Sequence, residues 1–269
     1  MTVADDHQLA WELAREAGQR LLDLRAGGDV PAEALRDAGD RLSHEYLMAE
    51  LARLRPSDAV LSEEGADDQA RLAARRVWIV DPLDGTREFG EEGRDDWAVH
   101  VALWERGARG GRGTPTAGTP AIGTLTAGAV ALPAQGRVLS TVRPPRLQGT
   151  PDSARTLRLV VSRSRAPRLV QQVAGLLKAE LVPCGSAGAK VATVLSGETD
   201  AYIHAGGFYE WDTAAPVAVA LAAGYHASRI DGADIEYNRA DPLMPDILVC
   251  RPAIAGLLLE AIREATHAI

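Results

Sequence analysis

Apolar residues recur every three or four positions in two stretches near the beginning of the chain. This spacing is typical of helices that bury one face, and it predicts helices over residues 6–24 and about 37–54, the second ended by Pro56. Shorter apolar runs follow, one of which alternates with polar residues as a half-buried strand does. Strands are predicted over residues 59–64, 75–80, 95–106, 121–133 and 136–142. The first half therefore predicts two helices followed by an antiparallel run of strands.

Strand and helix patterns alternate in the second half of the chain. Strands are predicted over residues 157–162, 179–184, 200–205, 225–230 and 246–250, and helices over residues 166–179, 187–196, 212–223 and 252–266. This alternation is typical of a layered α/β arrangement. Residues 107–120 lack periodicity and predict a loop without chemistry, and the proline-rich residues 143–156 are the best candidate for a domain boundary. We therefore expect an N-terminal α+β part over residues 1–148 and a C-terminal α/β part over residues 149–269.

Composition places the chain among ordinary globular proteins, with 46% hydrophobic and 25% charged residues. The net charge of −8 and the lack of a basic block argue against nucleic acid as a partner. No apolar run is long enough to cross a bilayer, and the acidic, helical N-terminus does not resemble a signal peptide. Cys184 and Cys250 lie in apolar runs without metal or disulfide spacing. We expect a reduced, cytoplasmic protein that acts on a small molecule and does not bind a membrane.

Acidic residues follow two of the predicted strands and begin one predicted helix. Glu63 and Glu64 end the first of these strands, Asp81 and Asp84 end the second eighteen residues later, and Asp212 begins the helix. Each position has an ordinary explanation: a helix cap for Asp212, a turn for Asp84 with the following glycine, and a solvated loop for the glutamates. Buried carboxylates, however, repel each other unless a positive charge separates them. Together they predict an oxygen ligand set for Mg²⁺, with Asp81 as the bridge between two ions.

Groups suited to binding a phosphate accompany this acidic set. Gly85 permits close approach of the backbone, and N–H groups at the start of a following helix favour an anion. Among the 29 basic residues only Lys178 and Lys190 are lysines, so a specific use of their compact charge is one explanation and chance is the other. The pattern therefore indicates metal-assisted chemistry on a phosphoryl group.

Three segments, SEEG, DPLDGT and EWDTAAP, occur in an order and spacing that resemble the inositol monophosphatase superfamily of lithium-sensitive, magnesium-dependent phosphatases. TREF and CGSAGAK are more similar to CysQ-type 3′(2′),5′-bisphosphate nucleotidases, in particular actinobacterial ones, than to inositol monophosphatases, which usually have T-x-N-F. The resemblance covers nearly the whole chain and is weakest before Ala38 and over residues 106–120. It implies an α/β (α+β) fold, a layered αβαβα sandwich of the inositol monophosphatase and fructose-1,6-bisphosphatase type, with metal ions between the two parts.

The resemblance also implies which residues hold metal. A first ion is expected on Glu63, Asp81 and the backbone carbonyl of Leu83. A second is expected on Asp81, Asp84 and Asp212, and a weaker third on Glu63 and water. We therefore expect two or three Mg²⁺ ions in each active site.

Asp40 and Thr86 are the implied catalytic pair, which orients the attacking water. The chain departs from the family just before Asp40, where LRDAGD replaces a T-K-x-D segment, so it stays open whether Arg36 replaces the usual basic residue. His100 and His204 are interpreted as structural histidines. The implied substrate contacts are Gly85, Thr86, Arg87, Arg165, Gly185, Ser186 and Lys190.

The implied reaction is hydrolysis of 3′-phosphoadenosine 5′-phosphate to AMP and phosphate in sulfate assimilation, by in-line attack of a metal-activated water. A further candidate substrate is 3′-phosphoadenylyl sulfate. A covalent aspartyl-phosphate on Asp81 or Asp84 is the alternative chemistry. Inositol monophosphate and fructose 1,6-bisphosphate are the alternative substrates, and a non-catalytic metabolite-binding regulator is the alternative class. Relatives occur as monomers or homodimers, so the oligomeric state, like lithium sensitivity, stays open.

Overall fold

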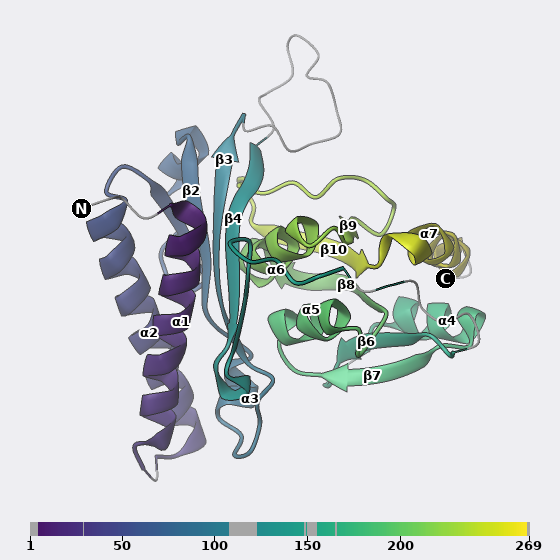
Figure 1. The fold of residues 1–269 in the computed structure, drawn as a ribbon, viewed down its shortest axis with the longest axis horizontal. Coiled ribbons are helices and arrows are strands. Elements are labelled where there is room, and N and C mark those ends of the chain that lie inside the picture. The colour runs from purple at the N-terminus through teal and green to yellow at the C-terminus, as the bar shows by residue number, and fades with distance from the viewer. Residues whose placement is uncertain are drawn as a thin grey trace.

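The computed structural model describes residues 5–28, 30–107, 123–147, 149, 155–164 and 166–267. Its helices and sheets form five layers in the order helix, sheet, helix, sheet, helix (Figure 1). Three apolar clusters fill the spaces between successive layers. The expected αβαβα sandwich is therefore confirmed.

The first layer consists of α1 (Asp6–Ala26) and α2 (Ala32–Leu54). The side chain of Asp5 caps α1 by accepting the N–H of Gln8 at 2.7 Å, and the apolar face of the helix packs against the sheet. The α2 helix begins five residues earlier than expected. Pro31 stands at its N-cap, and the Ala-Glu-Ala-Leu segment that follows consists of good helix formers.

The first sheet has the strand order β1-β2-β3-β4-β5. Its strands are β1 (Ala59–Ser62), β2 (Arg76–Asp84), β3 (Ala98–Arg106), β4 (Gly123–Leu132) and β5 (Arg137–Ser140). The β1 strand is parallel to β2, and all later neighbours are antiparallel, which confirms the expected antiparallel run.

An irregularity at the end of β2 determines the direction of two acidic side chains. Asp81 pairs with His100 and Asp84 pairs with Ala98, so three steps along β2 match only two along β3. Residues three apart in a regular strand point to opposite faces, and one extra residue in the strand reverses that relation. Asp81 and Asp84 therefore both point to the face that packs against the central helices.

The second sheet has the strand order β7-β6-β8-β10-β9. Its strands are β6 (Arg158–Ser162), β7 (Glu180–Cys184), β8 (Ala201–Tyr209), β9 (His226–Ser228) and β10 (Leu243–Cys250). The β6 strand is parallel to both β7 and β8, whereas β10 is antiparallel to β8 and β9. The β8 strand extends four residues beyond its expected end at residue 205. Gly206 and Gly207 suggest a turn in the sequence, but the strand continues through them.

Two helices from the second half of the chain lie between the sheets, α5 (Ala187–Ser196) and α6 (Glu210–Ala222). The last layer consists of α4 (Arg168–Leu177) and α7 (Pro252–His267). The central apolar cluster contains residues of both sheets and of α5 and α6, so the two halves share one core. The division into parts near residue 148 stays a prediction. Apart from Gly107, the expected loop 107–120 lies outside the described residues.

Within the described part of the chain, no helix combines the length and the apolar character that crossing a membrane requires.

Candidate active site

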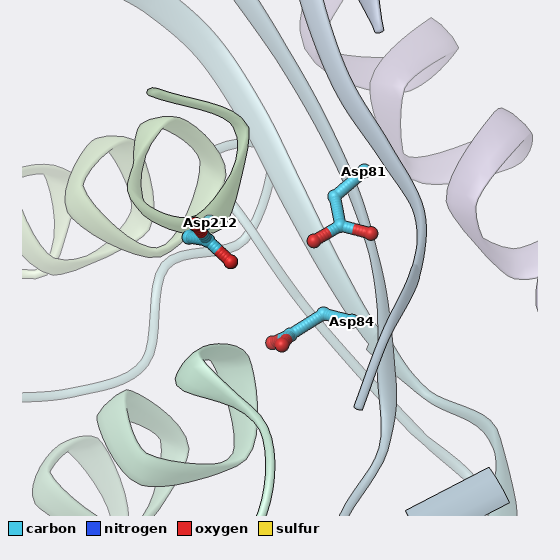
Figure 2. A group of neighbouring side chains, drawn as sticks. All are labelled: Asp81, Asp84 and Asp212. Carbon is cyan, nitrogen blue, oxygen red and sulfur yellow. The ribbon is translucent and has the colours of Figure 1, made fainter. Parts of the chain in front are cut away.

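Three aspartates from two distant parts of the chain meet between the first sheet and the central helices. Asp81 and Asp84 stand at the end of β2, and Asp212 stands in the first turn of α6. Each offers a carboxylate oxygen, and these oxygens lie within 4.8 Å of one another (Figure 2). Asp81 is 1% exposed and Asp84 is 7% exposed. The structure thus brings together the ligand set expected for the second ion.

The pKa values of three carboxyl groups in this cluster are raised, because the negative charges lie close together and the protein does not balance them. Burial raises the pKa of Asp81 well above its usual range, and the nearby charges of Glu63, Asp84 and Asp212 raise it further. Burial, followed by repulsion from Asp84, raises the pKa of Asp212 to about 7. The side chain of Glu63 has an exposed portion, but its carboxyl contacts Asp81, and desolvation there raises its pKa to about 7.

Asp84 differs from its neighbours because donors surround it. Its two oxygens accept the N–H groups of Ala187 at 3.1 Å and Gly188 at 2.7 Å, and the Nε2 atom of His100 lies 3.1 Å away. Burial alone raises the pKa of Asp84. The charges of His100 and Lys190 and the N–H of Gly188 outweigh that effect, so the pKa lies below its ordinary value. The first turn of α5 therefore fixes this carboxylate from the opposite half of the chain.

His100 belongs to the acidic cluster rather than to a purely apolar interior. It is fully buried, its Nδ1 atom lies 3.1 Å from the carbonyl of Trp211, and the same atom lies 4.0 Å from Asp81. Sequence reasoning interpreted this residue as structural. The signal that indicates its position is the pairing of β3 with β2, which puts His100 directly opposite Asp81.

The donor chemistry of the cluster fits a hard divalent cation. Apart from His100, the groups that converge there offer oxygen: the carboxylates of the three aspartates and of Glu63. The carbonyl of Leu83 accepts the Thr86 hydroxyl at 3.0 Å and keeps a second lone pair, while the N–H of Leu83 binds Asp81 at 3.0 Å. Such a set of carboxylates with a carbonyl is typical of magnesium and calcium sites.

The expected catalytic pair is also brought together. The hydroxyl of Thr86 lies 3.3 Å from a carboxylate oxygen of Asp40 on α2. Burial, followed by repulsion from Glu64, raises the pKa of Asp40 to about 7. Arg36 donates to the carbonyl of Ala32 at 3.2 Å within its own helix, and its charge counteracts part of that rise.

A close contact between the two halves explains the glycine after Asp84. Gly85 has a φ of 87°, and a Cβ built there would lie only 2.9 Å from the Cβ of Ser186. Both the conformation and the space therefore require glycine. Ser186 caps α5 by accepting the N–H of Ala189 at 3.0 Å, so this contact brings the start of α5 against the end of β2.

Lys190 lies in the first turns of α5, next to the acidic cluster. It is 5% exposed, it donates a hydrogen bond to the carbonyl of Gly185, and its Nζ atom lies 5.4 Å from the ring centroid of Tyr202. Burial lowers its pKa, and the charge of Asp84 opposes that shift. Gly185, Ser186 and Lys190 thus lie at the start of α5, whose N–H groups bind Asp84, and their role as substrate contacts stays a prediction.

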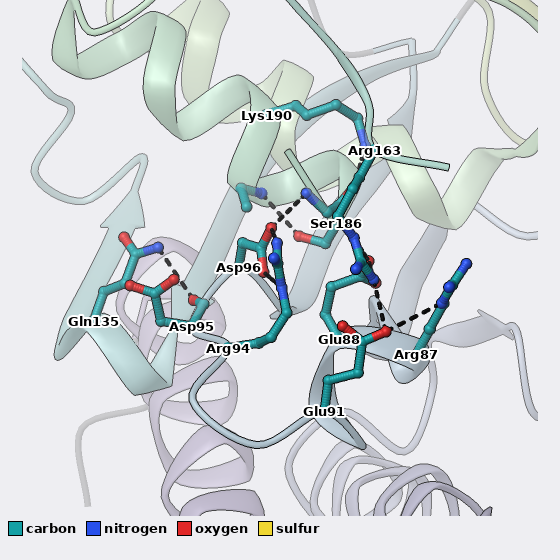
Figure 3. A network of polar contacts seen from close by, with 12 residues as sticks. Arg87, Glu88, Glu91, Arg94, Asp95, Asp96, Gln135, Arg163, Ser186 and Lys190 are labelled. Carbon is teal, nitrogen blue, oxygen red and sulfur yellow. Dashed lines mark hydrogen bonds and ion pairs between the residues drawn. The ribbon is translucent and has the colours of Figure 1, made fainter. Parts of the chain in front are cut away.

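One expected substrate contact, Arg87, is not brought into this group. The guanidinium of Arg87 pairs with Glu91 at 3.2 Å on the surface, where its side chain is 62% exposed. Arg165 lies outside the described residues. Its neighbour Arg163 instead donates to Glu88 at 2.7 Å and to Glu91 at 2.9 Å (Figure 3). Sequence reasoning missed this link, which joins β6 to the segment after β2.

Comparison with known proteins finds relatives along nearly the whole chain. The model of the inositol monophosphatase family matches residues 4–267. A relative from Mycobacterium leprae named 3′-phosphoadenosine 5′-phosphate phosphatase is 50% identical, with 96% of this chain and 94% of the relative covered. A relative from Salmonella typhimurium named 3′(2′),5′-bisphosphate nucleotidase CysQ is 30% identical over 84% of this chain and 92% of its own. The crystal structure of CysQ from Bacteroides thetaiotaomicron matches with a TM-score of 0.72 at 26% identity, covering 91% of this chain and 97% of that one.

Proposed function

The chain belongs to the inositol monophosphatase family, and from this premise we propose that it removes the 3′-phosphate of 3′-phosphoadenosine 5′-phosphate, giving AMP and phosphate. The observation that carries the choice of substrate is the 50% identity to the mycobacterial phosphatase along nearly the whole of both chains. The family is metal-dependent, and the clustered aspartates supply the matching ligands.

We assign two or three Mg²⁺ ions to the acidic cluster. Asp81, Asp84 and Asp212 would hold one, and Glu63 and the Leu83 carbonyl would join Asp81 around another. When bound, such ions neutralise charge on the phosphoryl oxygens and favour deprotonation of the attacking water.

Asp40 and Thr86 are assigned to the attacking water. The Thr86 hydroxyl lies between the Leu83 carbonyl and Asp40, at 3.0 and 3.3 Å. A pKa of about 7 lets the Asp40 carboxylate accept a proton near neutral pH and release it again. The two residues together orient the water and remove its proton during attack on phosphorus.

The positive charge of Lys190 and the backbone N–H groups of Gly85 and Thr86 are assigned to the phosphoryl oxygens. Lys190 is buried beside Asp84, so its charge acts where water does not screen it. Donors fixed in this way stabilise the charge that builds up during phosphoryl transfer. A covalent aspartyl-phosphate on Asp81 or Asp84 stays the alternative chemistry, and trapping such an intermediate would overturn the direct attack of water.

Phosphate release by the purified protein tests this proposal. With Mg²⁺ present, kcat/KM on 3′-phosphoadenosine 5′-phosphate should exceed that on inositol 1-phosphate and fructose 1,6-bisphosphate by at least about tenfold, a difference of ~1.4 kcal/mol. Equal or higher kcat/KM on the sugar phosphates would show that these, and not the nucleotide, are the preferred substrates. Tight nucleotide binding without phosphate release would indicate a regulator. Lithium inhibition, a role in sulfate assimilation and a cytoplasmic location stay predictions of this proposal.

A further inference from the structure

A pair of stacked aromatic rings lies beside the acidic cluster. The rings of Tyr209 and Trp211 are parallel within 10°, and their centroids are 4.7 Å apart. Trp211 is partly buried against the central core, whereas Tyr209 is 42% exposed. Among the large apolar and aromatic side chains that the structure describes as exposed, Tyr209 is the only aromatic one. An exposed ring that is held rigidly from behind is suited to binding another flat ring.

Two hydrogen bonds fix this pair relative to the metal ligands. The backbone N–H of Tyr209 donates to the carboxylate of Asp212 at 2.6 Å, and the carbonyl of Trp211 lies 3.1 Å from the Nδ1 atom of His100. The backbone of Tyr209 therefore contacts a carboxylate assigned to the metal. A Cβ built at Gly206 or Gly207, just before the pair, meets no atom within 4 Å, so both glycines border open space.

We propose that Tyr209, supported by Trp211, is the platform on which the purine base of the substrate stacks. This inference rests on the proposed function. In 3′-phosphoadenosine 5′-phosphate a single ribose separates the base from the phosphate that is removed, so a base site must lie close to the acidic cluster. Aromatic side chains bind bases through their faces, and removing one such ring typically weakens binding several-fold or more. Inositol phosphates carry no base and gain nothing from such a platform.

Kinetics of three variants test the platform. Tyr209→Ala keeps the backbone N–H that binds Asp212, so the metal ligand stays oriented. It should lower kcat/KM on 3′-phosphoadenosine 5′-phosphate about tenfold, mainly through KM, and lower it much less on inositol 1-phosphate. Tyr209→Phe, which keeps the ring, should restore the nucleotide KM. Leu257→Ala removes a similarly exposed apolar side chain on α7, in the outermost helix layer, and should leave the substrate ratio unchanged.

Binding of AMP and of inorganic phosphate to the Mg²⁺-loaded protein, measured by calorimetry, separates this inference from the proposed function. Tyr209→Ala should weaken AMP about tenfold more than it weakens phosphate. Equal changes for AMP and phosphate, or for the two substrates above, would overturn the platform even if the nucleotide is hydrolysed. If the wild-type protein does not hydrolyse the nucleotide, but Tyr209→Ala still weakens AMP binding more than phosphate binding, the proposed function is overturned and the base site is supported.

Discussion

Two acidic regions of the folded protein balance their negative charge in opposite ways. At the end of β2 and the start of α6, Asp81 and Asp212 face other carboxylates, and their pKa values are raised. In the segment after β2, Glu88 and Glu91 accept hydrogen bonds from Arg163, and the pKa of Glu91 is lowered. Unpaired buried charge destabilises a protein unless a ligand balances it. The contrast indicates that the first region, called the unpaired region below, is suited to binding a cation. The second, called the paired region, holds the structure together.

Ion-paired residues next to the paired region, Arg94 and Asp96, also help to position the carboxylate cluster. Asp96 accepts the N–H of Gly185 at 2.6 Å through its side chain and the N–H of Ser186 at 3.0 Å through its carbonyl. Arg94 binds the same carboxylate at 2.7 Å (Figure 3). These contacts fix the turn before α5, and the N–H groups of that helix bind Asp84. The arginine–carboxylate network therefore helps to orient Asp84, which the proposed function assigns to the metal.

The largest effect is expected from a change at Asp84, which is assigned to the metal. Asp84→Asn keeps one of the two oxygens that accept the N–H groups of α5, replaces the other by an NH2 group and removes the negative charge. Turnover of the nucleotide at saturating Mg²⁺ should fall at least about a hundredfold while circular dichroism stays unchanged. Asp95→Asn, which changes an exposed aspartate of the neighbouring segment, is the matched control. Wild-type turnover by Asp84→Asn would show that the cluster does not bind the catalytic metal.

A smaller effect is expected where a positive charge meets the unpaired region. Lys190→Gln should raise the KM for the nucleotide about tenfold, because a buried charge near the phosphoryl oxygens is lost. The only other lysine offers the control: Lys178→Gln, at the end of α4, should leave KM unchanged. An unchanged KM in Lys190→Gln would assign that lysine to structure alone.

The unpaired charge should also be visible in stability. A carboxyl whose folded-state pKa is raised stabilises the protein below its unfolded pKa, and this contribution is lost as the pH rises through about 7. Asp212→Asn should therefore make the metal-free protein about 1 kcal/mol more stable at pH 8, a Tm increase of roughly 3 °C, with little gain at pH 5. Mg²⁺ should stabilise the wild type more than the variant. Equal gains at both pH values would mean that the effect has another cause.

The smallest effect is expected in the paired region. A double-mutant cycle of Glu88→Gln and Arg163→Gln should give a coupling of about 1 kcal/mol in the free energy of unfolding, because the pair is only partly exposed. The exposed pair of Arg87 and Glu91, treated in the same way, should give a coupling near zero. A coupling near zero for Glu88 and Arg163 would remove the stabilising role assigned to this pair.

The two regions also differ in how far the sequence predicts them. The metal ligands follow from short motifs, because Asp81, Leu83 and Asp84 are close in sequence and the strand pattern locates them. The αβαβα layers followed from the resemblance, and the order of strands and helices agreed with it. The paired region depends on contacts between residues 75 positions apart, such as Arg163 with Glu88, and no local pattern reports them.

Features that the sequence did not indicate have similar physical reasons. Arg87 pairs at the surface with Glu91 one helical turn away, so its expected contact with the substrate stays a prediction. His100 has the spacing of an ordinary half-buried strand, and only the register with β2 reveals that it contacts Asp84. The α2 helix starts early because good helix formers follow Pro31 at its N-cap, and β8 is long because the strand continues through Gly206 and Gly207.

The most direct test of the central claim is a metal titration. The protein is stripped with a chelator, the residual metal content is measured, and phosphate release from 3′-phosphoadenosine 5′-phosphate is followed as Mg²⁺ is added at constant pH and ionic strength. The account predicts negligible turnover without the cation and a saturable rise that Asp84→Asn does not show. Full turnover by the metal-free protein in the presence of chelator would contradict the claim that the unpaired carboxylates act by binding metal.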